Sequence, residues 1–298
     1  VFTLASADGD VSPRYRSAML VGIRRGMEAG HAVPWAEAIA LAKKTLGFAQ
    51  AHVGDGARGP WLWARQDAME LVTEACGADA MPLEHDGKLI RLVEAVVETS
   101  PSWNPPQKQA PTRFNEVVQA SLNAESGRVA HLVIAVTLWG KRSGGEDWHQ
   151  PHQERIRSSL NHLRDRDDAG RVPAVAKLGS FLPQLLFLDE EWVSDSEHKL
   201  FTGGMSDPIQ QPFLGAYLAL ASFYRDSFNL VRPWLGKYVA KLPALVERED
   251  QREGDNSWSV AKYFLSEVLK GYLSGWLDLE EPDHLLEATF EGSRADDR

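Results

Sequence analysis

Three histidines and three aspartates gather in one short stretch of the chain, and both residue types bind zinc and other divalent metals. They are His149, His152, His162, Asp165, Asp167 and Asp168. Pro151 separates the first two histidines, which favours a loop that enters a helix. Ten positions separate His152 from His162, and on a helix this places them about 80° apart, off a common face. We therefore interpret the stretch as a solvated helix start, with a metal or acid/base site near His149, His152 and His162 as the alternative.

Two further features have chemical precedents. The glycines of 54–59 match the G-x-G-x-x-G pattern that binds dinucleotide phosphates when it follows a strand. Here the preceding residues have a helical pattern, which predicts a loop between two helices.

Cys76, the single cysteine, precedes Gly77 at an expected helix end. A helix C-terminus raises the pKa of a thiol, so we expect a small buried side chain and no nucleophile.

Tryptophan is unusually frequent, with ten residues in the chain. Most of them lie on apolar stripes and are expected to fill space between helices. Trp103, Trp148 and Trp258 stand in polar or loop contexts instead. Because exposed tryptophans are enriched where proteins bind partners, these three are our candidates for a partner contact.

Arginines are concentrated in two groups, and acidic residues accompany the second group. The groups are Arg14, Arg16, Arg24 and Arg25, and then Arg155, Arg157, Arg164, Arg166 and Arg171. Interleaved opposite charges are typical of a solvated helix face with ion pairs. The chain has a net charge of −10, which argues against nucleic acid as the partner.

Most of the chain has the apolar periodicity of amphipathic helices, and no segment alternates as a strand does. Ser12-Pro13 predicts a helix start, and Gly30 predicts its end. The next helix begins at Pro34 and buries one stripe: Trp35, Ile39, Ala42, Leu46 and Ala49. A junction between helices is predicted at 123–127, where Gly127 allows close approach.

Later in the chain, breaks and stripes are predicted as well. Separate helices are expected over 127–141 and 151–165, and over 172–188 and 190–200 with a kink or split at Pro183. The last strong stripe is Val260, Phe264, Leu265, Val268, Leu269, Tyr272 and Trp276. We expect Trp276 to pack on Trp234, Tyr238 or Leu242 of the preceding helix.

The fold expected from these patterns is all-α, with about 13 helices arranged as antiparallel pairs. The first helix starts, at Pro13, Pro34 and Pro60, give 47 residues per pair, which matches HEAT and armadillo repeats stacked as an α-solenoid. Four prolines interrupt the pattern over 101–112. We therefore expect a helical section over 1–100, a loop or hinge over 101–112, and a second helical section over 113–298.

Composition narrows the class of protein. Of the 298 residues, 43% are hydrophobic, enough for a sizeable core. No stretch is long and apolar enough to span a membrane, and one cysteine allows no internal disulfide. We expect a cytoplasmic protein with no membrane contact. Because the chain begins at Val1 and not at methionine, we also expect a piece of a longer protein.

Several segments in order resemble one known group of proteins. They are residues 61–72, 121–132, 138–139 and 179–192. Together they resemble the helical C-terminal region of large bacterial proteins that carry a sirtuin-like or STAND/NACHT NTPase module and are linked to anti-phage defence. In that family the second segment reads Asn-Ser-x-Arg-Gly-x-Ala, and this chain keeps Asn123, Gly127 and Ala130. The resemblance covers roughly 34–276 and implies a sensor or scaffold region, with any enzyme activity on another module.

The sequence thus predicts a non-catalytic helical-repeat scaffold or sensor region. Its expected partner is a protein or other domains of the same polypeptide, and no cofactor, metal site or catalytic residue is expected. The alternative is an all-α enzyme whose site includes the three histidines at 149, 152 and 162.

Overall fold

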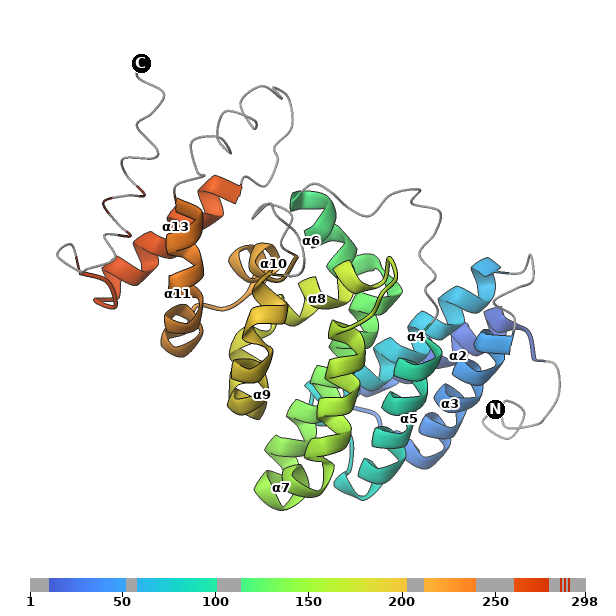
Figure 1. Ribbon diagram of the computed structural model, residues 1–298. Helices are drawn as coiled ribbons and strands as arrows, with labels where there is room; N and C mark the ends of the chain where they lie inside the picture. Colours follow the sequence, from blue (N-terminus) through green and yellow to red (C-terminus); the bar gives the residue numbers. More distant parts are fainter. Residues whose placement is uncertain are drawn as a thin grey trace. The chain divides into compact units, whose positions relative to one another are not determined.

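The computed structural model describes residues 11–51, 58–100, 114–202, 212–239 and 260–278, together with Leu285, Glu287 and Thr289. In these ranges it contains eleven α-helices, one short 3-10 helix and no strand (Figure 1). The all-α prediction is therefore confirmed. The count of about 13 helices and the solenoid arrangement stay predictions. Within the described ranges, no helix combines the length and apolar character needed to cross a bilayer.

The chain forms two compact units, and neither is continuous in sequence. Unit 1 consists of residues 1–104 and 128–168, and unit 2 of 105–127 and 169–298. This differs from the expected sections, which placed 128–168 with the C-terminal part. The reason lies in long-range contacts: Trp139 donates its indole N–H to the Met81 carbonyl at 2.9 Å, and Arg142 reaches Asp79 at 2.7 Å.

Unit 1 begins with α2 (Pro13–Glu28), α3 (Trp35–Ala51) and α4 (Arg58–Gly77), which pack against one another. Ser12 caps α2 by accepting the Tyr15 amide at 3.3 Å, and Gly30 follows the helix with φ +78°. Both predicted ends of α2 are thereby confirmed. The predicted stripe of α3 is buried in full: Trp35, Ile39, Ala42, Leu46 and Ala49.

A network of polar side chains fixes the direction of α2 against α4. Ser17 donates to Asp67, and Arg24 pairs with Glu70 at 2.6 Å and with Glu74 at 3.3 Å. Because residues later in α2 meet residues later in α4, the two helices run parallel. Arg128 also pairs with Glu70, which ties residues of the later segment to α4.

The rest of unit 1 comprises η1 (Leu83–His85), α5 (Asp86–Thr99) and most of α7 (Glu125–Arg164). α7 turns at Gly145, whose φ of +62° and ψ of −152° are not helical. Val136 before this turn and Ile156 after it line the same small cavity, so the two halves form an antiparallel hairpin. The predicted gap over 142–150 is therefore a one-residue turn and not a loop.

Unit 2 is built around α8 (Arg171–Ser180), in which every residue from Val172 to Ser180 is buried. It packs against α6 (Phe114–Asn123), α9 (Leu182–Thr202) and α10 (Pro212–Leu220). α11 (Arg225–Val239) contacts α9, and α13 (Val260–Leu273) contacts α10. Four buried apolar side chains from α6, α8 and α10 form one core cluster: Val117, Val172, Ala176 and Ala216.

Two glycines of unit 2 allow backbones to meet. A Cβ on Gly179 of α8 would lie 2.0 Å from the Phe213 carbonyl oxygen of α10. A Cβ on Gly127 would lie 2.3 Å from the Ser121 carbonyl oxygen. The predicted junction near 123–127 is confirmed, since α6 ends at Asn123 and α7 begins at Glu125. A methyl group at either glycine would force the neighbouring backbone to move.

Both breaks predicted near α9 are confirmed. α8 ends at Ser180 and α9 starts at Leu182, so Pro183 lies in a first turn, where its missing N–H is harmless. Asp189 interrupts α9 with φ −160°. Its carboxylate accepts the amide of Trp192 at 3.0 Å, so it caps the helical segment that follows.

Trp276 does not lie at the end of α13 as predicted, although its ring centroid is 6.1 Å from that of Phe228 in the preceding helix α11. α13 ends at Leu273, where Gly275 has φ +68° and the Trp276 amide bonds back to the Gly271 carbonyl at 2.9 Å. This left-handed glycine closes the helix as a Schellman motif does. Trp276 therefore lies beyond the helix and stacks on Phe223, with ring centroids 4.5 Å apart.

Of the three expected partners of Trp276, one is described and is engaged elsewhere. Trp234 stacks on Phe201 and donates its indole N–H to Glu197 at 2.8 Å. The side chain of Tyr238 and all of Leu242 lie outside the described residues. The predicted stripe also fails at Tyr272, which is 39% exposed.

Candidate functional site

The predicted histidine cluster does not assemble into a metal site. Among the described residues, no group of three or more His, Cys, Asp or Glu side chains is placed to hold a metal ion. His149 is buried, while His152 packs its ring on Trp148 at 4.9 Å and lies 3.5 Å from the Asp86 carboxylate. His162 lies on the same helix and is exposed. The second half of α7 therefore uses His149 and His152 within unit 1, whereas His162 faces solvent.

Trp148 was predicted to be a surface contact, but the structure buries it. It is 5% exposed and lies edge-on to Trp139, with ring centroids 6.3 Å apart. Its ring occupies the space left by the missing side chains of Gly140 and Gly144, where a Cβ would come within 2.5 Å of it. The sequence context is polar, but the hairpin of α7 covers the side chain. Trp103 and Trp258, the other two candidates, lie outside the described residues.

Cys76 is a buried side chain, as the sequence predicts. This burial raises the pKa of its thiol to about 12, although nearby Arg142 lowers it in part. A thiol with such a pKa is not ionised near neutral pH and does not serve as a nucleophile. The glycine motif at 54–59 comes after the helix α3, which ends at Ala51, and its last two residues belong to α4, while residues 52–57 lie outside the described ranges. It lacks the strand that a dinucleotide site requires.

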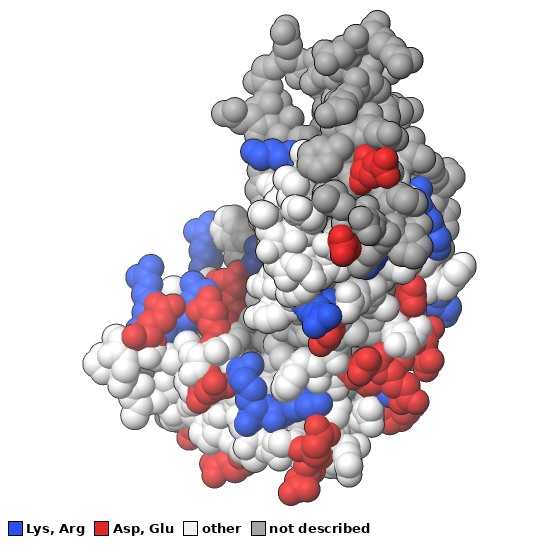
Figure 2. Space-filling view, turned by 90° about the vertical axis from the view of Figure 1, so that its left-hand side faces the viewer, with Lys and Arg blue, Asp and Glu red and all other residues white. Residues whose placement is uncertain are grey.

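The second arginine group forms ion pairs, as its interleaved acids predict. Arg155 donates to Glu94 at 2.6 Å and thereby lowers the pKa of that carboxyl. Arg164 pairs with Asp165 and Arg166 with Asp168 in the same way. On the face shown in Figure 2, blue and red side chains lie interspersed among the described residues, without a broad basic field. This pattern does not suit a phosphate backbone.

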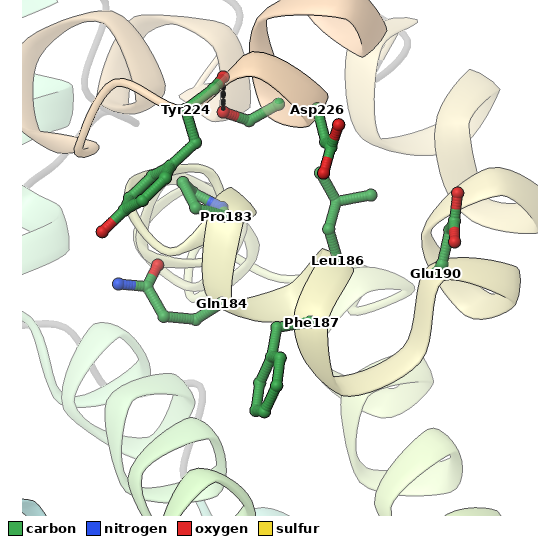
Figure 3. Close-up of a pocket in the computed structure, with 8 residues that line it drawn as sticks. Pro183, Gln184, Leu186, Phe187, Glu190, Tyr224 and Asp226 are labelled. Carbon is green, nitrogen blue, oxygen red and sulfur yellow. Dashed lines mark hydrogen bonds between the residues drawn. The ribbon is translucent and has the colours of Figure 1, made fainter.

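A groove in unit 2 is the most developed surface feature that the structure describes. It has a volume of about 460 Å³, within the range of about 300–1,000 Å³ typical of ligand sites. Its lining comes from α9 and from the turn that begins α11 (Figure 3). The eight residues are Pro183, Gln184, Leu186, Phe187, Glu190, Tyr224, Asp226 and Ser227.

Helical spacing places the α9 residues of this groove together. Pro183 and Phe187 are four positions apart and share one side of the first helical segment, and Glu190 lines the groove from beyond the interruption at Asp189. Leu185 and Leu188 point into the core and are buried, whereas Phe187 between them is 57% exposed. The segment that positions the groove is therefore anchored by leucines and presents an aromatic ring outward.

The opposite wall is held by local hydrogen bonds at the start of α11. The Tyr224 carbonyl accepts the Ser227 hydroxyl and the Phe228 amide, both at 2.9 Å. With its backbone fixed in this way, Tyr224 still has a side chain that is 58% exposed. In Figure 3, Tyr224 and Gln184 lie on one side of the groove, and Asp226 and Glu190 on the other.

A buried polar pair lies behind this wall. Tyr217 of α10 donates its hydroxyl to Glu267 of α13 at 2.7 Å, and Lys270 reaches the same carboxylate at 3.3 Å. Burial raises the pKa of both Tyr217 and Glu267, because removal from water penalises their charged forms. The Tyr217–Glu267 bond joins α10 to α13.

The polar groups of the groove mostly accept hydrogen bonds. Glu190 and Asp226 are exposed, and neither forms an ion pair with a basic residue in the described ranges. The Oε1 atom of Gln184 is buried and has no hydrogen-bond partner among the described residues. The eight lining residues include no Lys, Arg or His. The arrangement offers aromatic rings and two carboxylates to whatever binds there.

Unit 1 has a second hollow, of about 440 Å³, along the outer side of α2. It is lined mainly by apolar side chains, among them Met19, Ile23 and Val33. A Cβ on Gly22 or Gly26 would meet nothing within 4 Å, so this face has room. It holds no carboxylate or arginine that would indicate the chemistry of an occupant.

The α9–α11 groove was not predicted from the sequence. Phe187 lies within the run Leu185-Leu186-Phe187-Leu188, where all residues look like core. One signal was available: Phe187 lies two positions from Leu185, so it falls off the buried face of the helix. No pattern in the sequence indicated that Tyr224 lines a groove, because only the fold brings it next to α9.

Comparison with known proteins yields no relative for this chain, since no family model, curated protein or solved structure matches it.

Proposed function

We propose that the chain is a helical scaffold or sensor region that binds a protein partner through the groove between α9 and α11, without a catalytic step of its own. The observation that carries the proposal is the pair of exposed aromatic residues that line this groove, Phe187 of α9 and Tyr224 just before α11. Exposed aromatic side chains bury large area at low entropic cost and are enriched at binding hot spots.

The surroundings of the two rings support the same proposal. Both walls are held by buried residues: Leu185 and Leu188 anchor α9, and Ser227 anchors the start of α11. Pre-organised walls reduce the entropy lost when a partner binds. Neither wall brings a histidine, cysteine or paired acid and base to the groove, so the lining favours recognition over chemistry.

The resemblance to the helical C-terminal regions of large bacterial proteins agrees with this proposal. In such an arrangement the partner would be another protein or another module of the same polypeptide, and an effector activity would reside elsewhere. Anti-phage defence is the biological setting that the resemblance proposes for it.

The proposal is tested by site-specific photo-crosslinking in the native cell. A benzoylphenylalanine replaces Phe187 in one version of the chain and Tyr272, an exposed aromatic outside the groove, in the control. We expect one protein, identified by mass spectrometry, to be cross-linked from position 187 and not from 272. Equal cross-linking patterns at the two positions would contradict a partner site at the groove.

A further inference from the structure

We infer that the α9–α11 groove takes a cationic side chain, lysine or arginine, from a segment of the partner protein. This inference rests on the proposed function and adds the chemistry of the occupant. The first ground is electrostatic. Glu190 and Asp226 both line the groove without an ion pair from the described basic residues, and the lining has no positive charge.

The second ground is the aromatic wall. Tyr224 presents more than half of its side chain to solvent, and the face of an aromatic ring attracts a cation within about 6 Å of its centroid. The same unit already uses this contact, because the Lys237 ammonium lies 3.7 Å from the ring centroid of Trp234. A cation between Tyr224 and the carboxylates would gain both interactions at once.

The third ground is a hydrogen-bond acceptor of Gln184 that lacks a donor. The Oε1 atom of Gln184 is buried at the groove and accepts no hydrogen bond from any described residue. A buried acceptor without a donor costs free energy, and an N–H group from a ligand would remove that cost. Lysine offers three donors and arginine five, whereas an acidic side chain offers none when ionised.

The stems of these side chains also fit the lining. Lysine and arginine carry aliphatic stems that pack on apolar surface while the charged head stays near acceptors. Pro183, Leu186 and Phe187 supply that apolar surface next to the two carboxylates. The net charge of −10 over the whole chain would in addition speed the approach of a basic segment at low salt.

The test uses the full chain and four sets of synthetic heptapeptides. Each set has arginine, lysine, norleucine or glutamate at the centre and equal mixtures of alanine, leucine and serine elsewhere. Binding is measured by fluorescence anisotropy at low and at high salt. Because a cation–π contact and exposed ion pairs each contribute modestly, we expect arginine and lysine peptides to bind about five- to tenfold tighter than norleucine peptides at low salt.

The variants locate this preference. The double variant E190Q/D226N and the single variant Y224A should each reduce the preference for a central cation. D195N removes one charge from an exposed position of α9 that does not line the groove, so it should leave the preference unchanged. Circular dichroism of each variant checks that the helices are intact.

The outcomes separate this inference from the proposed function. Equal binding of norleucine and arginine peptides, or a preference that survives E190Q/D226N, would overturn the cationic occupant. If position 187 still cross-links to one partner in that case, the groove is a docking site of another chemistry. Absence of a groove-specific cross-link would refute the proposed function itself, whatever the peptides do.

Discussion

Replacing Gly179 with alanine tests the packing of unit 2 most directly. The added Cβ would lie 2.0 Å from the Phe213 carbonyl oxygen, whereas ordinary contact begins near 3.4 Å, so α10 would have to retreat by about 1.4 Å. Helix propensity alone favours the change by up to about 1 kcal/mol. Overpacking of this kind costs about 1–3 kcal/mol, and here the atom that must give way is backbone. We expect the free energy of unfolding to fall by about 1–3 kcal/mol.

A second glycine of the same unit provides the control. Gly236 lies in α11, and a Cβ there meets nothing within 4 Å. Gly236→Ala should therefore stabilise the protein by about 0.5–1 kcal/mol, through propensity alone. Urea unfolding followed by far-ultraviolet circular dichroism measures both variants. If Gly179→Ala proves as stable as Gly236→Ala, α8 and α10 do not meet at the distance that the structure gives, and the reasoning fails.

Three further predictions follow from buried groups. Trp148→Ala should cost about 3–5 kcal/mol in urea unfolding because it opens a cavity in the α7 hairpin, while Trp63→Ala, at a site 57% exposed, should change stability little; similar losses would contradict the burial of Trp148. Burial raises the pKa of Glu267 above its ordinary 4.5, so its contribution to stability is fully present below that pH and is lost as pH rises through the folded pKa. Glu267→Gln should remove this decline while it keeps an acceptor for Tyr217, and an unchanged pH profile of the unfolding midpoint would refute it. Cys76 should react with a thiol reagent such as DTNB only after unfolding, because its thiol is buried with a pKa of about 12; stoichiometric reaction of the folded protein would show otherwise.

The candidate site shows where reasoning from the sequence stops. Tryptophans in polar contexts were the natural choice for a contact surface, yet Trp148 is covered by the turn at Gly145. Exposure depends on which neighbours come back over a side chain, and that depends on contacts far apart in the chain. Phe187 and Tyr224 form one groove although 37 positions separate them, and no local pattern reports such a pairing.

Local rules determined the helices and their ends. The Ser12 cap, the left-handed Gly30, the break at Pro183 and the buried stripe of α3 follow from interactions within a few residues, so the sequence alone predicts them. The all-α class follows for the same reason. The termination of α13 depends on Gly275, a signal present in the sequence and not used in our prediction.

The tertiary structure alone decided how the helices are grouped. The proline-rich stretch at 101–112 suggested a boundary, but residues 128–168 pack with the first helices because Trp139, Arg142 and Arg155 find their partners in residues 79–94. Such partners are chosen by shape and charge across distances of more than 50 residues along the chain. An amphipathic stripe indicates that one face of a helix must pack against another element. It does not indicate which helix provides that packing. The pairing of helices in the tertiary structure therefore determined both the two units and the groove between α9 and α11.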